Sequence, residues 1–309
     1  MKRLILALTV LIGAAHAQDD WYPSQWGADD TLGAANHLSA EGVVNAAKLV
    51  TTGKTYSLGV EVSRETPAYG TTRTFQFFAV PGGDGTGAVI GSNEATSNDD
   101  YVFTWIGIGS QIDGLGHLGI NHRYYNGLQQ SEIFTPEGLA KLGVNDIPPI
   151  VTRGVLLDMT KQFGKDVLDP GTAINQPEID AASQAQGVTI GKGDVVLLHT
   201  GWLAKADTDP DLFVTVQPGL GVQGAQYLAE KGVVAVGADT IALEVIPFEK
   251  ETEAFPVHQT LLAKNGVYIL ETLDTRELAA DGVSEFLFVL GQLKMKGSVQ
   301  MMINPIAIR

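Results

Sequence analysis

Two short segments of the chain contain polar side chains whose types and spacing could do chemistry. The first, residues 107–117 (GIGSQIDGLGH), follows an apolar run and offers Gln111, Asp113 and His117 among four glycines. Glycine lets the backbone turn tightly and approach a ligand or an ion without a Cβ in the way. The loop can therefore aim an amide, a carboxylate and an imidazole at one point. The simpler interpretation is a strand end with polar residues at its exit.

The second segment places an imidazole and a carboxylate at the two ends of one predicted hairpin. His258 opens a short amphipathic helix over residues 257–264, and Glu271 follows the apolar strand 267–270. A helix, a turn and a strand in succession can bring these two side chains together. A lone histidine is more often structural, but a carboxylate that leaves an apolar strand is costly to bury without a partner.

The elements that must position these residues follow an α/β pattern. Strands and helices alternate in the second half of the chain, which predicts a largely parallel sheet. Residues 81–100 are rich in Gly, Ser, Asn and Asp, and we interpret them as a long surface loop that is either solvated or a lid over a site. No repeat or linker divides the chain, so we expect one domain over residues 18–309. The predicted strands are 55–62, 75–80, 102–108, 149–159, 194–199, 233–236, 267–270 and 298–308, and the predicted helices are 39–53, 177–186, 222–231, 257–264 and 283–293.

The N-terminus has the parts of a secretory signal peptide. Lys2 and Arg3 precede an apolar run, and Ala15-His16-Ala17 provides the small residues that signal peptidase needs. The apolar run is too short to cross a hydrocarbon core of about 30 Å. We therefore expect cleavage after residues 1–17, no membrane span in the mature chain, and a periplasmic or secreted protein.

Composition restricts the class of partner. The chain has 309 residues, no cysteine and a formal net charge of −15. An exported protein without disulfides must rely on burial for its stability. An acidic surface disfavours nucleic acid and anionic lipid, which bind basic surfaces. The expected partner is a small-molecule substrate, and the sequence leaves open whether the chain forms a homo-oligomer.

Residues 107–117 resemble the signature of the cyclase family, the kynurenine formamidase-like hydrolases, which reads His-x-Gly-Thr-His-x-Asp-x-Pro-x-His. His258 and Glu271 are similar to the second metal-ligand segment of that family. The resemblance implies a swivelling β/β/α fold with a mixed sheet and metal-dependent hydrolysis of amides. Further similar fragments occur in the family's order: WGADD at 26–30, YNG at 125–127, RGVLLD at 153–158, GDVVLL at 193–198, PGL at 218–220 and NPIA at 304–307.

The resemblance also implies a role for each matching residue. Asp113 and Glu271 are similar to the metal-binding carboxylates, His258 to a metal ligand, and His117 to the proton-transferring histidine. Such a set can hold a divalent ion that lowers the pKa of water towards 7. A nearby histidine can then move protons between the water and the leaving group.

Two positions depart from the signature, because Gly107 and Gln111 stand where it has its first two histidines. An amide oxygen is a weaker zinc ligand than an imidazole nitrogen. We therefore expect a single ion, Mn²⁺, Zn²⁺ or Mg²⁺, with Gln111 as a further ligand. This describes a variant branch of the family with Gln-x-Asp in place of His-x-Asp, and loss of the metal is the alternative.

Four more residues are candidates for contacting the substrate. Tyr125 and Asn126 follow the signature closely, Trp26 opens one of the similar fragments, and His199 ends a predicted strand. Each also fits a structural role, since aromatic side chains more often pack than bind a ligand.

Together these features predict a metal-dependent hydrolase of an amide, lactam or lactone bond in a small molecule. Water activated by the metal would attack the carbonyl, and His117 would relay the proton. Two alternatives stay open: a metal-free binding protein on the same fold, and a lyase or cyclising enzyme in which His117 and a carboxylate act as acid and base. A glycine pattern at 219–224 resembles a dinucleotide fingerprint, but Pro218 interrupts the approach to it.

Overall fold

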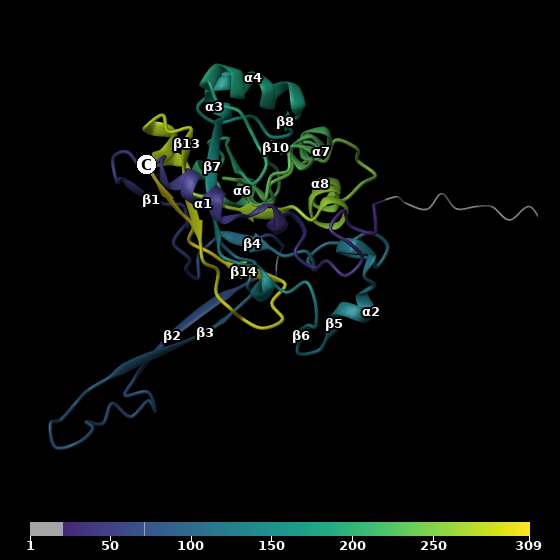
Figure 1. Ribbon diagram of the computed structural model, residues 1–309. Helices are drawn as coiled ribbons and strands as arrows, with labels where there is room; N and C mark the ends of the chain where they lie inside the picture. Colours follow the sequence, from purple (N-terminus) through teal and green to yellow (C-terminus); the bar gives the residue numbers. More distant parts are fainter. Residues whose placement is uncertain (1–20, 71) are drawn as a thin grey trace, which may run out of the picture.

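The computed structural model describes residues 21–70 and 72–309, so the predicted signal peptide at 1–17 lies outside the described residues. Its centre is a nine-stranded sheet in the order β1-β15-β13-β7-β9-β11-β12-β4-β14 (Figure 1). The four middle strands run parallel and are almost completely buried, as parallel sheets with both faces covered usually are. These strands are β7 (Ile150–Asp158), β9 (Val195–His199), β11 (Ala235–Ala238) and β12 (Tyr268–Glu271).

Antiparallel strands extend the sheet on both sides. Beyond β7 lie β13 (Glu285–Leu290), β15 (Ile306–Ile308) and β1 (Thr55–Ser57). Beyond β12 lie β4 (Gln111–Asp113) and β14 (Gln300–Met302). The sheet is therefore mixed, and the α/β fold class predicted from the sequence is confirmed.

Helices connect the parallel strands. α4 (Gln176–Gln186) lies between β7 and β9, and α7 (Val222–Glu230) between β9 and β11. α8 (Pro256–His258) continues into the π-helix η4 (Gln259–Asn265), which leads to β12. The remaining elements are α1 (Ala40–Ala47), α2 (Gln130–Ile133), α3 (Met159–Phe163), α5 (Ala204–Thr208), α6 (Pro210–Phe213), α9 (Arg276–Ala280), η1 (Gly33–His37), η2 (Tyr125–Gly127), η3 (Val144–Asp146), and the strand pairs β5 (Phe134–Thr135) with β6 (Gly138–Leu139) and β8 (Ala173–Ile174) with β10 (Gly219–Leu220).

Burial of apolar side chains stabilises this arrangement. Every residue of β9 and β11 is buried, and each fully buried Val, Leu or Ile contributes about 1.5–3 kcal/mol. A core of this size explains how a chain without cysteine can be stable. Among the residues that the structure describes, no helix is long and apolar enough to span a membrane.

The prediction of a helix over residues 283–293 is wrong, because this segment forms β13. Phe286, Phe288 and Leu290 are buried, and the residues between them are half-buried. That alternation has the two-residue period of a strand, and aromatic side chains favour a pleated sheet. Hydrophobicity alone cannot assign a short apolar run to a helix or to a strand. Pairing with β7 and β15 decides that this run is a strand.

The prediction of a loop over 81–100 holds for residues 82–97, but the two ends of that segment belong to strands. β2 (Phe75–Pro81) and β3 (Asn98–Thr104) form an antiparallel hairpin, and residues 82–97 form its tip. We call residues 75–104 the arm. Figure 1 shows the arm projecting away from the body of the protein, so its tip is no lid over the sheet.

The predicted strand over 298–308 is interrupted. β14 ends at Met302 and β15 begins at Ile306, and Pro305 lies between them. Proline has no N–H to donate to a ladder. Only three residues separate β14, which lies beside β4, from β15, which lies beside β13. At about 3.3–3.6 Å per residue this link is too short to pass along a flat nine-stranded sheet, so the sheet is curled and its two sides lie close together.

Candidate functional site

The sheet register puts the polar residues of the glycine-rich loop beside the carboxylate of the second segment. In the antiparallel pair of β4 and β12, Gln111 lies opposite Glu271, and Asp113 lies opposite Ile269. Residues that lie opposite each other point to the same face, and so do residues two positions apart. Gln111, Asp113 and Glu271 therefore share one face at one end of the sheet.

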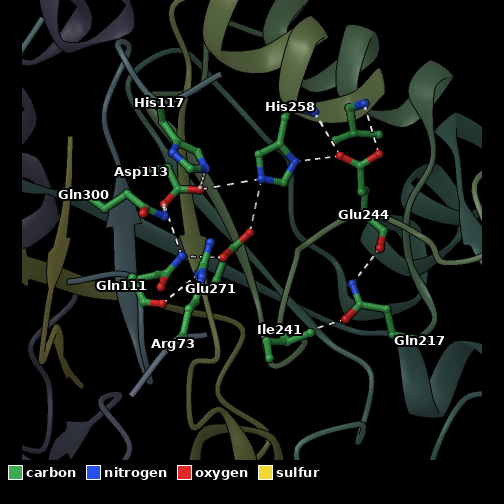
Figure 2. A network of polar contacts seen from close by, with 12 residues as sticks. Arg73, Gln111, Asp113, His117, Gln217, Ile241, Glu244, His258, Glu271 and Gln300 are labelled. Carbon is green, nitrogen blue, oxygen red and sulfur yellow. Dashed lines mark hydrogen bonds and ion pairs between the residues drawn. The ribbon is translucent and has the colours of Figure 1, made fainter. Parts of the chain in front are cut away.

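His258 reaches the same place from a helix. Phe255 has a left-handed backbone with φ of 52°, and Pro256 then begins α8. His258 Nε2 lies 3.5 Å from Asp113 Oδ2 and 3.3 Å from Glu271 Oε1. Figure 2 shows these three side chains pointing toward one another. The structure thus brings together the carboxylates and the imidazole that the sequence singled out.

His117 lies on the more open side of this cluster. Its Nε2 is 3.8 Å from Asp113 Oδ2, and its side chain keeps 22 % of its surface exposed, whereas Asp113 is fully buried. One ligand atom from each of Asp113, His117 and His258 lies within 4.8 Å of the others. His117 is therefore placed either to bind an ion or to exchange a proton beside it.

Glu244 is a member of the cluster that the sequence did not reveal. Its Oε1 accepts a hydrogen bond from His258 Nδ1 at 2.6 Å and from the His258 backbone N–H at 3.1 Å. Its Oε2 accepts from the backbone N–H of Val257. A carboxylate that accepts from one imidazole nitrogen fixes the ring and leaves the other nitrogen for a metal. The only signal in the sequence was an acidic residue inside the otherwise apolar run 241–246.

Gln300 is the second residue that the sequence did not reveal. Its Nε2 donates to Asp113 Oδ1 at 2.7 Å. A Cβ on Gly107 would lie only 2.6 to 2.9 Å from the Gln300 amide. The Gln300 side chain thus occupies the space beside Gly107, where the signature has its first histidine. Because 187 residues separate Gln300 from Asp113, no local pattern could have connected them.

Gln111 binds both carboxylates. Its Nε2 donates to Glu271 Oε2 at 2.6 Å and to Asp113 Oδ1 at 3.2 Å. Together with Gln300, it gives the carboxylates neutral N–H partners on the side where the signature has histidines. These contacts leave the second oxygen of each carboxylate facing His258.

Burial and mutual charge shift the proton affinities in the cluster. Burial and the charge of Asp113 raise the pKa of Glu271 to about 7. Burial alone would lower the pKa of His258, but Asp113, Glu244 and Glu271 outweigh it and hold that pKa well above its usual value. Burial would raise the pKa of Asp113, yet His117 and His258 lower it. Three buried carboxylates therefore favour a positive charge at their centre.

The hydrogen bonding of Asp113 Oδ2 shows whether the residues fit a metal. Asp113 Oδ2 is buried and has no hydrogen-bond donor among the described residues, although a buried oxygen normally has one. Asp113 Oδ2 lies 3.8 Å from His117 Nε2 and 3.5 Å from His258 Nε2, and His258 Nε2 lies 3.3 Å from Glu271 Oε1. Tetrahedral ligands at roughly 2.1 Å from one ion lie about 3.4 Å from each other. The donor set therefore fits one divalent cation, which would replace the proton on His258 Nε2.

Aromatic side chains pack in a row beside His258. The Phe255 ring lies 5.3 Å from the His258 ring, edge to face, and the rings of Phe248 and Tyr69 lie 5.2 and 5.8 Å from Phe255. On the other side, Arg73 Nη1 donates to the carbonyl of Gly107 at 2.7 Å. The cluster thus has an apolar side and a cationic side.

Tyr125, Asn126 and Trp26 do not join the cluster. The Tyr125 hydroxyl donates to Asp30 Oδ2 at 2.6 Å. Asn126 Nδ2 donates to the carbonyls of residues 27, 28 and 30. Trp26 packs edge to face on His37, with ring centroids 4.9 Å apart. The polar contacts of Tyr125 and Asn126 thus fix the segment around residues 24–30.

His199 lies on the other face of the sheet. Leu197 lies opposite Gly237, which lies opposite Leu270. His199, two residues after Leu197, therefore points to the face of Leu270 and away from that of Glu271, because side chains alternate along a strand.

There His199 belongs to a different polar group. Its Nδ1 lies 2.7 Å from Thr275 Oγ1 and 3.5 Å from Asp239 Oδ2. It lines a separate cavity of about 440 Å³ together with Asp158 and Arg276. As a substrate contact of the cluster around Asp113, His199 is in the wrong place.

Comparison with known proteins agrees with the fold. The chain is 30 % identical to a protein whose structure is described as a novel cyclase, with a TM-score of 0.83, covering 93 % of this chain and 98 % of that chain. It is 18 % identical to isatin hydrolase A from Ralstonia solanacearum, with a TM-score of 0.62, covering 87 % of this chain and 95 % of that one. It is 19 % identical to a "predicted metal-dependent hydrolase" from Bacillus stearothermophilus, with a TM-score of 0.55, covering 83 % and 98 %.

No curated protein matches the chain. The family model named Cyclase matches residues 56–245, a stretch that includes Asp113, His117 and Glu244. The match and the mixed sheet confirm the resemblance seen in residues 107–117. The chain belongs to the cyclase family.

Proposed function

We propose that the chain is a hydrolase that adds water to an amide, lactam or lactone carbonyl of a small molecule, and that it uses one divalent cation. The observation that supports this most is the buried, unpartnered Oδ2 of Asp113, which faces two imidazole nitrogens. Isatin hydrolases of the same fold act, by their name, on a cyclic amide. Mn²⁺, Zn²⁺ and Mg²⁺ are the candidate ions.

Asp113, His258 and Glu271 would hold the ion, with Gln111 as a further ligand if its amide turns its oxygen inward. The ion would supply a Lewis acid and lower the pKa of water. Glu244 keeps the His258 ring in the required orientation through the bond at Nδ1. The aromatic side formed by Phe255, Phe248 and Tyr69 would exclude water and bind the apolar part of the substrate.

His117 would transfer the proton. Burial lowers the pKa of His117 below its ordinary value, so the ring is neutral at pH 7 and its Nε2 can accept a proton. In amide hydrolysis, that proton leaves the attacking water and is then donated to the departing nitrogen. Its partial exposure lets the ring contact a substrate that enters from solvent.

The test combines elemental analysis of the purified protein with an activity screen over formamides, cyclic imides and lactones, with and without added Mn²⁺, Zn²⁺ or Mg²⁺. We expect one ion per chain. A cyclic imide or lactone should give one product heavier than the substrate by one water, and a formamide should give formate and an amine whose combined mass exceeds that of the substrate by one water. Products without this added water would indicate a lyase or cyclising reaction and would contradict hydrolysis.

A metal-free binding protein is the second candidate. The side-chain amides of two glutamines beside the carboxylates favour it. Gln111 and Gln300 already give the carboxylates three N–H contacts. If this interpretation holds, added metal changes neither the melting temperature nor the affinity for any small molecule.

The placement in a Gln-x-Asp branch and the export of the chain also remain proposals. N-terminal sequencing of the mature protein tests the cleavage before Gln18.

A further inference from the structure

Arg73 places a positive charge beside the anionic cluster. Its Nη1 donates to the carbonyl of Gly107 at 2.7 Å, and the residue is partly buried. Figure 2 shows the Arg73 side chain pointing toward Gln111 and Glu271. A guanidinium has five N–H donors, and among the described residues this hydrogen bond is the only one that Arg73 makes. Most of its N–H groups therefore have no acceptor in that part of the chain.

Arg73 makes no ion pair with any residue that the structure describes, although a guanidinium beside carboxylates usually binds them. Two amides explain this. Gln111 donates to Glu271 Oε2 and to Asp113 Oδ1, and Gln300 donates to the same oxygen of Asp113. Because these oxygens already have N–H partners, the guanidinium keeps its capacity for another anion.

The position of the guanidinium is fixed by its contact with Gly107. A Cβ on Gly107 would lie only 2.6 to 2.9 Å from the Gln300 amide, so this peptide and the amide are packed together. The same amide donates to Asp113 at 2.7 Å. Burial is the main cause that lowers the pKa of His117, and the charge of Arg73 lowers that pKa further. The cation is therefore close to the residue that would transfer the proton.

Hydrolysis creates a negative charge on the acyl group of the substrate twice. When water adds to the carbonyl carbon, the π electron pair moves to the carbonyl oxygen. The pair returns as the bond to nitrogen or to the ester oxygen breaks, and the leaving atom takes the proton that the water lost. The product acid then releases its own proton to solvent and becomes a carboxylate. Buried carboxylates repel both anions, so a cation beside them stabilises the reaction.

We propose that Arg73 binds the oxygen of the scissile carbonyl as it becomes an oxyanion and then binds the product carboxylate. The inference rests on the proposed hydrolysis and names the residue that recognises the acyl group. A guanidinium can donate two parallel N–H bonds to one carboxylate, which an ammonium cannot do. The ligand class is therefore a small carboxylate, and the matching substrate is its amide or ester.

Benzoate and benzamide test this without turnover. The two molecules have the same ring and nearly the same shape, but only benzoate is an anion. We expect the wild type, as purified, to bind benzoate more tightly than benzamide by isothermal titration. Arg73→Gln should weaken benzoate binding by about tenfold, as loss of a charged hydrogen bond does. Benzamide affinity should stay the same, because the amide carries no charge.

Arg64→Gln is the matched control. Arg64 also donates to a backbone carbonyl, that of Phe77, but this contact is exposed, so neither affinity should change. Elemental analysis of Arg73→Gln should find the metal content of the wild type, because a guanidinium repels a metal cation. Loss of metal from Arg73→Gln would make Arg73 a structural support of the site and would overturn the proposal.

Three further results would overturn it: a wild type that does not bind benzoate, an Arg73→Gln that binds benzoate as the wild type does, and an equal loss of benzamide affinity. Arg73→Lys keeps the charge and should bind benzoate more tightly than Arg73→Gln, and equal binding by the two variants would also contradict the proposal.

The proposed hydrolysis can fail separately from the role of Arg73. Benzoate binding that depends on Arg73 in a protein without hydrolytic activity would support the anion site and reject the hydrolase. Hydrolysis by a protein whose benzoate binding does not depend on Arg73 would support the hydrolase and reject the anion site.

Discussion

Two histidines, His258 and His199, lie at the same edge of the sheet on opposite faces. They differ in the number of carboxylates that surround the ring. His258 is within 3.5 Å of three buried carboxylates, and both of its ring nitrogens face them. His199 has one carboxylate, Asp239, at 3.5 Å, and a threonine hydroxyl is its nearest partner. Within the part of the chain that the structure describes, one buried carboxylate oxygen in each group has no hydrogen-bond donor: Oδ2 of Asp113 and Oδ2 of Asp239.

The difference shows what makes a candidate metal site here. At His258 the neighbouring antiparallel strand β4 adds a carboxylate that faces the imidazole. At His199 the neighbouring strands are parallel, and the next carboxylate along the edge, Asp158, bonds to Lys161 instead. Convergence of carboxylates from separate elements, rather than the presence of a buried histidine, therefore separates the two groups.

The largest expected effect tests this comparison directly. Asp113→Ala should abolish metal binding and activity, because it removes the one ligand oxygen that faces both His117 and His258. Asp113→Asn keeps the shape and should also lose the ion. Asp239→Asn, the matched change on the other face, should leave metal content unchanged by elemental analysis. Equal loss of metal in Asp239→Asn would mean that the two groups are one site.

His117→Ala should keep the fold and the metal but lower turnover by about 10²–10⁴-fold, the usual contribution of one general acid–base group. Steady-state kinetics at saturating metal measures the decrease. His117 Nε2 is close enough to Asp113 to be a ligand. Metal loss as complete as in Asp113→Ala would therefore assign His117 to the ion and remove it from proton transfer.

Glu244→Gln should weaken metal affinity by about 10–100-fold, the usual effect of changing a carboxylate that orients a ligand imidazole. The glutamine oxygen can still accept from His258, but the amide lacks the negative charge that holds the Nδ1 proton. Isothermal titration measures the affinity. Glu249→Gln is a control of the same type on the protein surface, and a decrease of equal size there would exclude a role through His258.

Sequence reasoning located residues that are close in the chain or lie in a recognisable motif. Asp113, His117, His258 and Glu271 came from two short segments, and the fold class came from the alternation of strands and helices. Glu244 and Gln300 were missed because their partners are 14 and 187 residues away, and only the sheet order brings them together. The prediction of a helix over 283–293 was wrong because a short apolar run is compatible with the period of a helix and with that of a strand.

Gln111→His would restore one signature ligand. Gln111 Nε2 lies 2.6 Å from Glu271, so an imidazole there can reach an ion held by the carboxylates. Because imidazole is the better zinc ligand, zinc should bind about tenfold more tightly. An unchanged affinity would place the ion on the His117 side of Asp113, out of reach of position 111.

The smallest effect is expected at His199. Thr275 is fully buried and its hydroxyl makes the shortest contact of the His199 ring, so Thr275→Val should lower the free energy of unfolding by about 1 kcal/mol. Asp239 can accept the hydrogen bond from His199 Nδ1 in place of Thr275, and this limits the loss in the free energy of unfolding. Urea denaturation measures the loss, while metal affinity and turnover should equal those of the wild type. If metal affinity falls as far as expected for Glu244→Gln, the two faces of the sheet are coupled, and the group around His199 contributes to the candidate metal site after all.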